Sequence, residues 1–108
     1  MDTPQPTPMH LNVTLPTDAE VGVFADLANV WHTPNTFVID FLSVKQPAQS
    51  VQHDDGTTAA RIDATIATRV RIPPEQVFGL IRALNEQGQR WLAENGRSEP
   101  PESWLPHP

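Results

Sequence analysis

Two β-prone runs joined by a short run of turn residues constrain the fold of this chain more than any other feature. The runs cover residues 21–32 and 37–44, and Thr33-Pro34-Asn35-Thr36 lies between them. Proline fixes its own φ and asparagine tolerates a positive φ, so Pro34 and Asn35 suit the two central positions of a tight turn. The sequence therefore predicts a β-hairpin.

A turn at Pro34-Asn35 also sets the register of the hairpin. Partners then pair outwards from Thr33 with Thr36 as far as Leu27 with Leu42, and directly opposed residues share one face of a sheet. One face then carries Phe24, Ala28, Val30, Phe37, Ile39 and Phe41, and the other carries Val23, Ala25, Leu27, Trp31, Val38, Leu42 and Val44. Both faces of the predicted hairpin are apolar.

Apolar periodicity predicts the remaining elements. Residues 10–15 and 61–72 alternate between apolar and polar, which indicates strands. After Pro74, which suits the first helical position, apolar residues recur at helical spacing until Asn95-Gly96 provides a stop signal. The expected fold is α+β, with an antiparallel sheet of about four strands (10–15, 21–32, 37–44 and 61–72) followed by one C-terminal amphipathic helix (74–95).

The distribution of proline divides the chain of 108 residues into one domain and two tails. Proline-rich composition without apolar periodicity predicts a disordered tail at 1–9 and a second tail at 97–108. Between them we expect a single domain, 10–96, with a flexible loop at 46–60, where polar and turn residues show no periodicity.

Two glycines lie inside the predicted helix. Gly79 and Gly88 each cost roughly 1 kcal/mol relative to alanine at such positions. They indicate either close packing against a neighbour or defects that the helix tolerates, and the sequence leaves both interpretations open.

The predicted hairpin requires cover on both of its faces. One helix covers only one face of a small sheet, and an uncovered apolar patch of several hundred Å² marks an interface. The simplest cover is a second copy of the chain around a twofold axis; the alternative is that the N-terminal strand, the long loop or the C-terminal tail folds back. The residues expected at the interface are Val23, Leu27, Trp31, Val38, Leu42, Trp104 and Leu105.

Composition excludes several classes of chemistry. The chain has no cysteine, so disulfides, thiolate metal sites and cysteine nucleophiles are excluded. Its formal charge of −6 argues against nucleic acid, although Arg61, Arg69 and Arg71 share one face of the predicted last strand and are either solvated or an RNA contact. With no phosphate loop and no metal-ligand spacing, we expect no cofactor. No leader or membrane span is evident, so we expect a cytoplasmic protein.

The polar residues of the hairpin form a candidate site. In the predicted register His32 falls on the face opposite Asn29 and Asp40, so the three side chains do not converge for catalysis. Asn29 and Asp40 oppose each other directly, which predicts a buried polar pair joined by a hydrogen bond across the strands. His53-Asp54-Asp55 lacks the alternating oxygen ligands that calcium needs, so it predicts a solvated turn.

Two blocks of sequence resemble the family known as domain of unknown function 3467. They are Ala25–Phe41 (ADLANVWHTPNTFVIDF) and Thr68–Glu86 (TRVRIPPEQVFGLIRALNE). The family often has Ser or Thr before the proline at the helix entry, whereas here Pro73 cannot supply a side-chain cap. The resemblance implies no agreed activity.

The order of several strands followed by a long helix is also similar to that of SecB-type export chaperones, which are oligomers that hold unfolded chains. Fold alone does not give function. We expect a homo-oligomeric protein-binding or scaffold module, not an enzyme, whose partners are further copies of itself and other proteins. The alternative is a small-molecule-binding protein or enzyme with a site at the subunit interface, using Asn29, Asp40 or His32.

Overall fold

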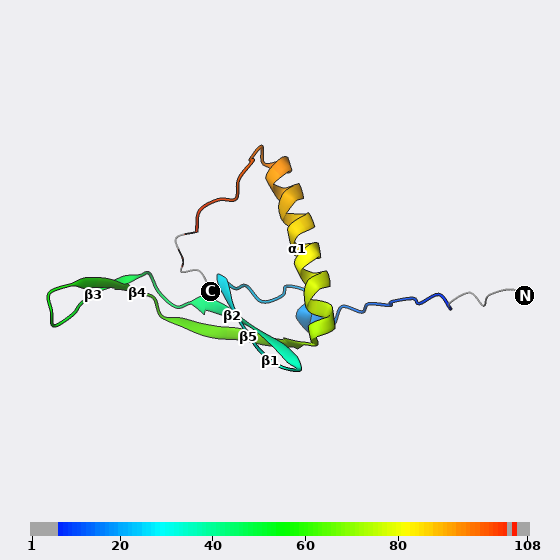
Figure 1. The fold of residues 1–108 in the computed structure, drawn as a ribbon, viewed down its shortest axis with the longest axis horizontal. Helices are drawn as coiled ribbons and strands as arrows, with labels where there is room; N and C mark the ends of the chain where they lie inside the picture. The colour runs from blue at the N-terminus through cyan, green and yellow to red at the C-terminus, as the bar shows by residue number, and fades with distance from the viewer. Residues whose placement is uncertain (1–6, 104, 106–108) are drawn as a thin grey trace, which may run out of the picture.

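The computed structural model describes residues 7–103 and 105. It confirms the predicted α+β class, with antiparallel strands followed by one C-terminal helix (Figure 1). The elements are η1 (Thr17–Ala19), β1 (Leu27–Thr33), β2 (Thr36–Val44), β3 (Gln49–Gln52), β4 (Thr58–Arg61), β5 (Ala64–Ile72) and α1 (Pro74–Glu94). Strands β1, β2 and β5 form one sheet in the order β1-β2-β5, and β3 and β4 form a separate two-stranded ribbon.

The β1-β2 hairpin has the predicted register, from Thr33 opposite Thr36 to Leu27 opposite Leu42. Among the described residues only glycines have positive φ, so Asn35 does not use the conformation it was expected to provide. Its backbone N–H instead points to the Thr33 hydroxyl, at 3.4 Å. The predicted start of the first strand at residue 21 was wrong, because Gly22 adopts a φ of 77° and β1 begins only at Leu27.

A β-bulge divides the apolar residues of β5 between the two faces of the sheet. Asp40 pairs with Arg69 and Phe41 with Thr68, but Leu42 pairs with Ile66, so Ala67 is the extra residue. Opposed residues share a face, and a bulge therefore reverses the alternation beyond it. The predicted continuous alternation of 61–72 was wrong here, since Ile66 lies on the same face as Leu42.

The two faces are named by their relation to α1. The inner face faces the N-terminal half of α1 and includes Val30, Phe37, Ile39, Val70 and Ile72. The outer face is on the other side and includes Asn29, Trp31, Val38, Asp40, Leu42, Ile66, Arg69 and Arg71.

The segment predicted as a flexible loop, 46–60, contains most of the β3-β4 ribbon, so it has regular structure that the sequence did not predict; its flexibility stays a prediction. The ribbon projects from the end of the sheet (Figure 1) and turns where His53 donates its backbone N–H to Thr57 at 2.8 Å. Gly56 has a φ of 88°, which a glycine adopts without steric cost. Residues 61–72 are therefore not one strand, since Arg61 ends β4 and β5 begins at Ala64.

The predicted strand at 10–15 was also wrong. This segment has no regular secondary structure, and Leu11 is 87% exposed. Its alternation suits a strand, but a strand needs a hydrogen-bonding edge beside it. In Figure 1 the N-terminal segment runs away from the sheet, so it does not lie along the free edge of β1 or of β5.

The helix begins and ends where the sequence predicts. Pro73 occupies the N-cap without a side-chain hydrogen bond, as expected, and Pro74 is the first helical residue. At the other end Gly96 has a φ of 65°, and the backbone N–H of Arg97 donates to the Leu92 carbonyl at 2.9 Å. This is a Schellman ending, which turns the chain back beside the helix.

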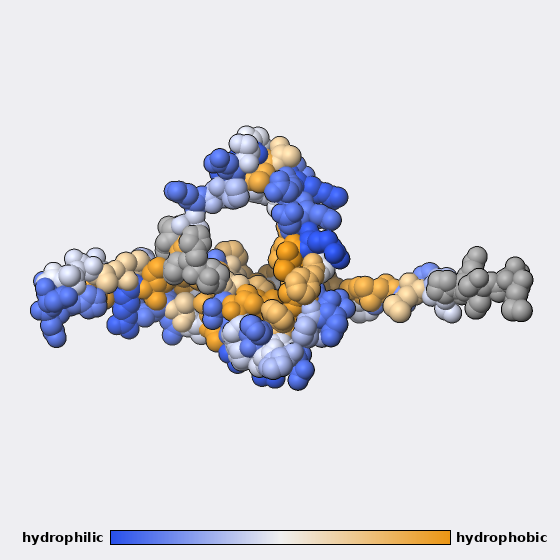
Figure 2. Space-filling model, viewed as in Figure 1, coloured by the Kyte–Doolittle hydropathy of each residue, from blue (hydrophilic) through white to orange (hydrophobic). Residues whose placement is uncertain are grey.

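The buried core within one chain is small. Among the described residues only Val38 and Leu92 are buried apolar side chains, and Asp40 is a buried charged one. The N-terminal half of α1 lies against the sheet and its C-terminal half extends beyond it, so hydrophobic residues border open space between helix and sheet (Figures 1 and 2). No helix within the described ranges is long and apolar enough to cross a membrane; the cytoplasmic location stays a prediction.

Candidate interaction site

Asp40 is the centre of a polar cluster on the outer face. Its side chain is only 5% exposed, and Arg69 donates two hydrogen bonds to it, from Nε to Oδ1 at 2.5 Å and from Nη2 to Oδ2 at 3.1 Å. Trp31 donates a third from Nε1 to Oδ2 at 3.2 Å. The Arg69 guanidinium also lies 5.6 Å from the Trp31 ring centroid, within cation–π range. Three hydrogen bonds from two side chains of the outer face thus converge on one carboxylate.

These contacts determine the charge state of the cluster. The hydrogen bonds from Arg69 lower the pKa of Asp40 below its ordinary value, and the bond from Trp31 acts in the same direction, against the effect of burial. The carboxylate in turn raises the pKa of Arg69. Both groups are therefore charged at neutral pH, as a bidentate arginine–carboxylate pair requires.

The predicted partner of Asp40 was wrong. Asn29 does lie opposite Asp40 in the register, but it is exposed, and no hydrogen bond between their side chains occurs in the part of the chain that the structure describes. Arginine reaches farther than asparagine and brings the opposite charge, which a buried carboxylate needs. The signal in the sequence was Arg69 itself, on the face of its strand that was expected to be solvated.

The other polar residues considered in the sequence lie apart from the Asp40 cluster. His32 lies on the inner face, where its ring stacks on Phe37 with 5.2 Å between centroids. Asp55, in the ribbon turn, accepts hydrogen bonds from Thr57, which lower its pKa. Residues 7–103 and 105 contain no group of three His, Cys, Asp or Glu side chains that could hold a metal ion.

The three arginines considered for RNA contact do not form one stripe. Arg61 belongs to β4, where its Nε lies 3.1 Å from Asp63. Arg69 is paired with Asp40, which leaves Arg71 on the outer face opposite Val38. The arrangement offers no continuous positive surface for a phosphate backbone.

The inner face contains an apolar cavity of about 300 Å³ between the sheet and the N-terminal half of α1. Its lining is formed by Val30, Phe37, Ile39, Ile72, Val77, Leu80, Ile81 and Leu84. Val30 remains 52% exposed, because the helix lies over only part of this face. Native interiors contain few voids of this size, so the helix and sheet of one chain do not complete a core.

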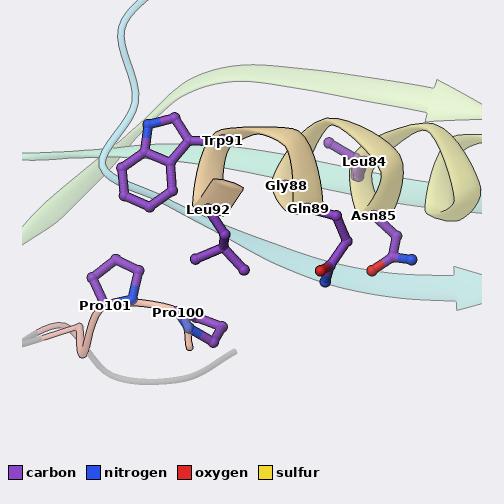
Figure 3. A pocket seen from close by; sticks show the side chains of 8 residues that line it. All are labelled: Leu84, Asn85, Gly88, Gln89, Trp91, Leu92, Pro100 and Pro101. Carbon is purple, nitrogen blue, oxygen red and sulfur yellow. The ribbon is translucent and has the colours of Figure 1, made fainter. Parts of the chain in front are cut away.

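A second hollow, of about 610 Å³, lies beside the C-terminal half of α1 (Figure 3). Leu84, Gly88, Trp91 and Leu92 line it from the helix, and Pro100 and Pro101 face them from the segment that follows. The two hollows share Leu84 and together follow the whole apolar side of α1. This side of the helix is therefore an apolar surface that one chain covers incompletely, with Leu84 65% exposed and Ile81 54% exposed.

The comparison with protein families gives one match. The model of the family described as "Protein of unknown function (DUF3467)" matches residues 1–97, most of the chain. The chain belongs to this family. No curated protein and no solved structure matches it, so the similarity of this DUF3467 protein to SecB-type chaperones remains one of element order.

The range of the family match can be compared with the fold. It includes both sheets and all of α1, and it ends at the residue after Gly96, where the helix terminates. Pro100 and Pro101, which form the far wall of the second hollow, lie outside the match. The apolar side of α1 thus belongs to the DUF3467 unit, whereas the segment facing it does not.

The residues predicted at an interface of the DUF3467 protein have different environments. Val38 is buried, Leu27, Leu42 and Leu105 are half-buried, and Val23 and Trp31 are exposed. Trp104 lies outside the described residues. Whether any of them contacts a partner stays a prediction. The apolar side of α1, which that prediction omitted, was visible in the sequence as the helical spacing of Val77, Ile81 and Leu84.

Proposed function

We propose that this DUF3467 protein works as a homo-oligomeric protein-binding or scaffold module whose first partner is a second copy of itself. The observation that carries the proposal is the amount of surface that one chain leaves uncovered. Its accessible surface is 9838 Å², whereas a compact monomer of this length has about 6,000 Å².

The excess is large enough to form a stable interface. It amounts to roughly 3,800 Å², and an obligate dimer buries about 1,000–2,500 Å² on each partner. Part of the excess belongs to the N-terminal segment and the ribbon, but the apolar side of α1 also contributes: Leu84 is 65% exposed and Ile81 is 54% exposed. A solvated monomer rarely leaves side chains of this kind uncovered in a continuous patch.

The character of this surface favours a protein partner. The cavity on the inner face is lined by apolar side chains, and the arginines closest to the sheet are largely engaged with carboxylates. An apolar lining of this kind suits the centre of a protein interface, from which charged residues are depleted. Nucleic acid would require the opposite composition.

The proposal is tested by the solution mass from light scattering, for the wild type and for Leu84→Asp. We expect an assembly larger than a monomer that dissociates in Leu84→Asp, because the substitution places a charge within the apolar side of α1. The matched control is Ala83→Asp, which adds the same charge to the same helix one residue away on its polar side and should leave the mass unchanged. A monomeric wild type at all concentrations would overturn the proposal.

Leu27→Asp tests the outer face in the same experiment. Leu27 is half-buried and was predicted at the interface. If self-association uses both faces of the sheet, this variant also lowers the mass; if it retains the wild-type mass while Leu84→Asp dissociates, the interface is restricted to the side of the helix.

A second candidate function is binding of a small apolar molecule, which the cavity of about 300 Å³ favours. Ligand sites are typically apolar cavities of about 300–1,000 Å³. Asn29, Asp40 and His32 do not line this cavity, so the proposed ligand is held by apolar contact. Native mass spectrometry of the purified protein should then show an adduct that Ile39→Trp removes by filling the cavity; a spectrum of protein alone would count against this candidate.

A further inference from the structure

We infer that the C-terminal half of α1 packs antiparallel against the same half of a second copy, with Trp91 of each copy seated over Gly88 of the other. The inference rests on the proposed self-association and names its contact. It starts from the two glycines inside α1, which lie on opposite sides of the helix.

Gly79 and Gly88 lie on opposite sides of the helix. They are nine residues apart, which at about 100° per residue is two and a half turns. Gly88 lies one turn after Leu84 and one turn before Leu92, within the apolar side. Gly79 lies instead near Glu75, Arg82 and Glu86, on the polar side. The two positions are therefore a matched pair within one helix.

Neither glycine is explained by contacts within the described chain. A Cβ added at Gly79 or at Gly88 meets no other atom within 4 Å, and neither residue has a positive φ. Glycine weakens a helix relative to alanine, so both positions reduce the stability of α1, and no contact within the described chain compensates for this loss. At Gly88 the bare backbone forms a gap on the apolar side of α1, and Pro100 and Pro101 across the hollow leave that gap unfilled.

The surroundings of Gly88 are suited to such a neighbour. The hollow of about 610 Å³ opens directly onto it (Figure 3), and Trp91 at its border is 45% exposed. The Arg97 guanidinium lies 5.7 Å from the Trp91 ring centroid and stabilises one side of that ring. The large aromatic side chain of Trp91 thus lies beside a gap, at Gly88, that suits an aromatic side chain of a second molecule.

The occupant that fits is a second copy of the same helix. Gly88 and Trp91 are three residues apart, so a twofold axis midway between them brings each tryptophan opposite the glycine of the other copy. One symmetric contact then fills both gaps and covers both tryptophans. Arg82, Glu86 and Arg90 lie on the other side of α1, so this contact buries none of these charges.

The test compares Gly88→Ala with Gly79→Ala in the full chain, by measuring the dissociation constant of the assembly with analytical ultracentrifugation. Both variants gain the same helix propensity, and neither added methyl meets an atom of its own chain. We expect Gly79→Ala to associate like the wild type and Gly88→Ala to associate at least about tenfold more weakly. Equal dissociation constants for the two variants would overturn the inference while leaving self-association intact.

A wild type that is monomeric at every concentration would overturn the proposed function as well, so the two failures are distinguishable.

The pairing itself is tested by disulfide formation, since the chain has no cysteine. In an equal mixture of Gly88→Cys and Trp91→Cys chains, the antiparallel contact predicts mixed disulfides over either symmetric product. A mixture of Gly79→Cys and Trp91→Cys chains is the control; a cross-linked yield equal to that of the first mixture would contradict the arrangement.

Discussion

The outer and inner faces of the β1-β2-β5 sheet are covered in different ways. On the outer face, Asp40 is bound by Arg69 and Trp31, and Val38 beside it is 2% exposed. On the inner face, α1 lies over part of an apolar surface and leaves a cavity beneath it. The centre of the outer face is thus completed by one chain, whereas the inner face is not.

The difference shows what each kind of interaction can do in a small chain. Three directed hydrogen bonds to one carboxylate hold side chains over the middle of the outer face. Apolar burial has no direction and depends on area, and a fold of this size has little area to bury. In our proposal a second copy of the chain supplies the missing cover of the inner face, and four changes test this contrast.

The largest effect is expected from Arg69→Met, which leaves Asp40 buried without its countercharge. Removing one partner of a buried ion pair is strongly destabilising, and we expect the midpoint of thermal unfolding to fall by roughly 10 °C or more. The double variant Asp40→Leu/Arg69→Met should recover most of this loss, because no uncompensated charge remains. Circular dichroism on heating measures both midpoints. If the single variant unfolds at the same temperature as the wild type, the ion pair does not stabilise the fold.

The next effect separates the two faces by their dependence on concentration. Val38→Ala removes buried methyl groups within one chain and should lower the free energy of unfolding by about 2 kcal/mol at every protein concentration. Val30→Ala, on the half-covered inner face, should cost little in dilute protein and more as the assembly forms. Denaturant unfolding at two concentrations compares them; equal behaviour would show that both faces are completed in the same way.

Acid should weaken the outer face through Asp40 and the ribbon turn through Asp55, because both carboxyl groups have a lowered pKa. The ordinary pKa of Asp40 is 3.8 and the folded pKa is lower, chiefly because of Arg69, so the unfolded chain binds more protons in acid than the folded chain. The stabilisation is therefore complete well above pH 4 and is lost as the pH falls through the folded pKa. Unfolding midpoints measured from pH 7 to pH 3 should decline in the wild type, and this part of the decline should be absent in Asp40→Asn.

The smallest effect is expected from Arg61→Ala. Arg61 and Asp63 form an ion pair between side chains that are 65% and 38% exposed. Exposed pairs contribute little, so the free energy of unfolding should change by less than about 0.5 kcal/mol. A loss as large as that of Arg69→Met would show that exposure does not distinguish the two pairs.

The sequence predicts the local parts of this fold well. The turn at Pro34-Asn35 fixes the hairpin register, and the signals at Pro74 and Gly96 fix the helix, because each depends on neighbouring residues. The bulge at Ala67 and the pairing of Asp40 with Arg69 depend on how β2 meets β5, nearly thirty residues away, and no local pattern sets that register. The prediction of a strand at 10–15 was wrong for the same reason. An alternating pattern does not show whether the edge of another strand lies beside the segment.

The ion pair at Asp40 also selects one alignment of β5 during folding. A slip of β5 by one residue would place Thr68 or Val70 opposite Asp40 and turn Arg69 to the inner face. The buried carboxylate would then have no cation, while an arginine would lie among the apolar residues beneath α1. Misaligned sheets therefore carry two electrostatic penalties at once, and contacts within one chain are enough to distinguish the correct alignment.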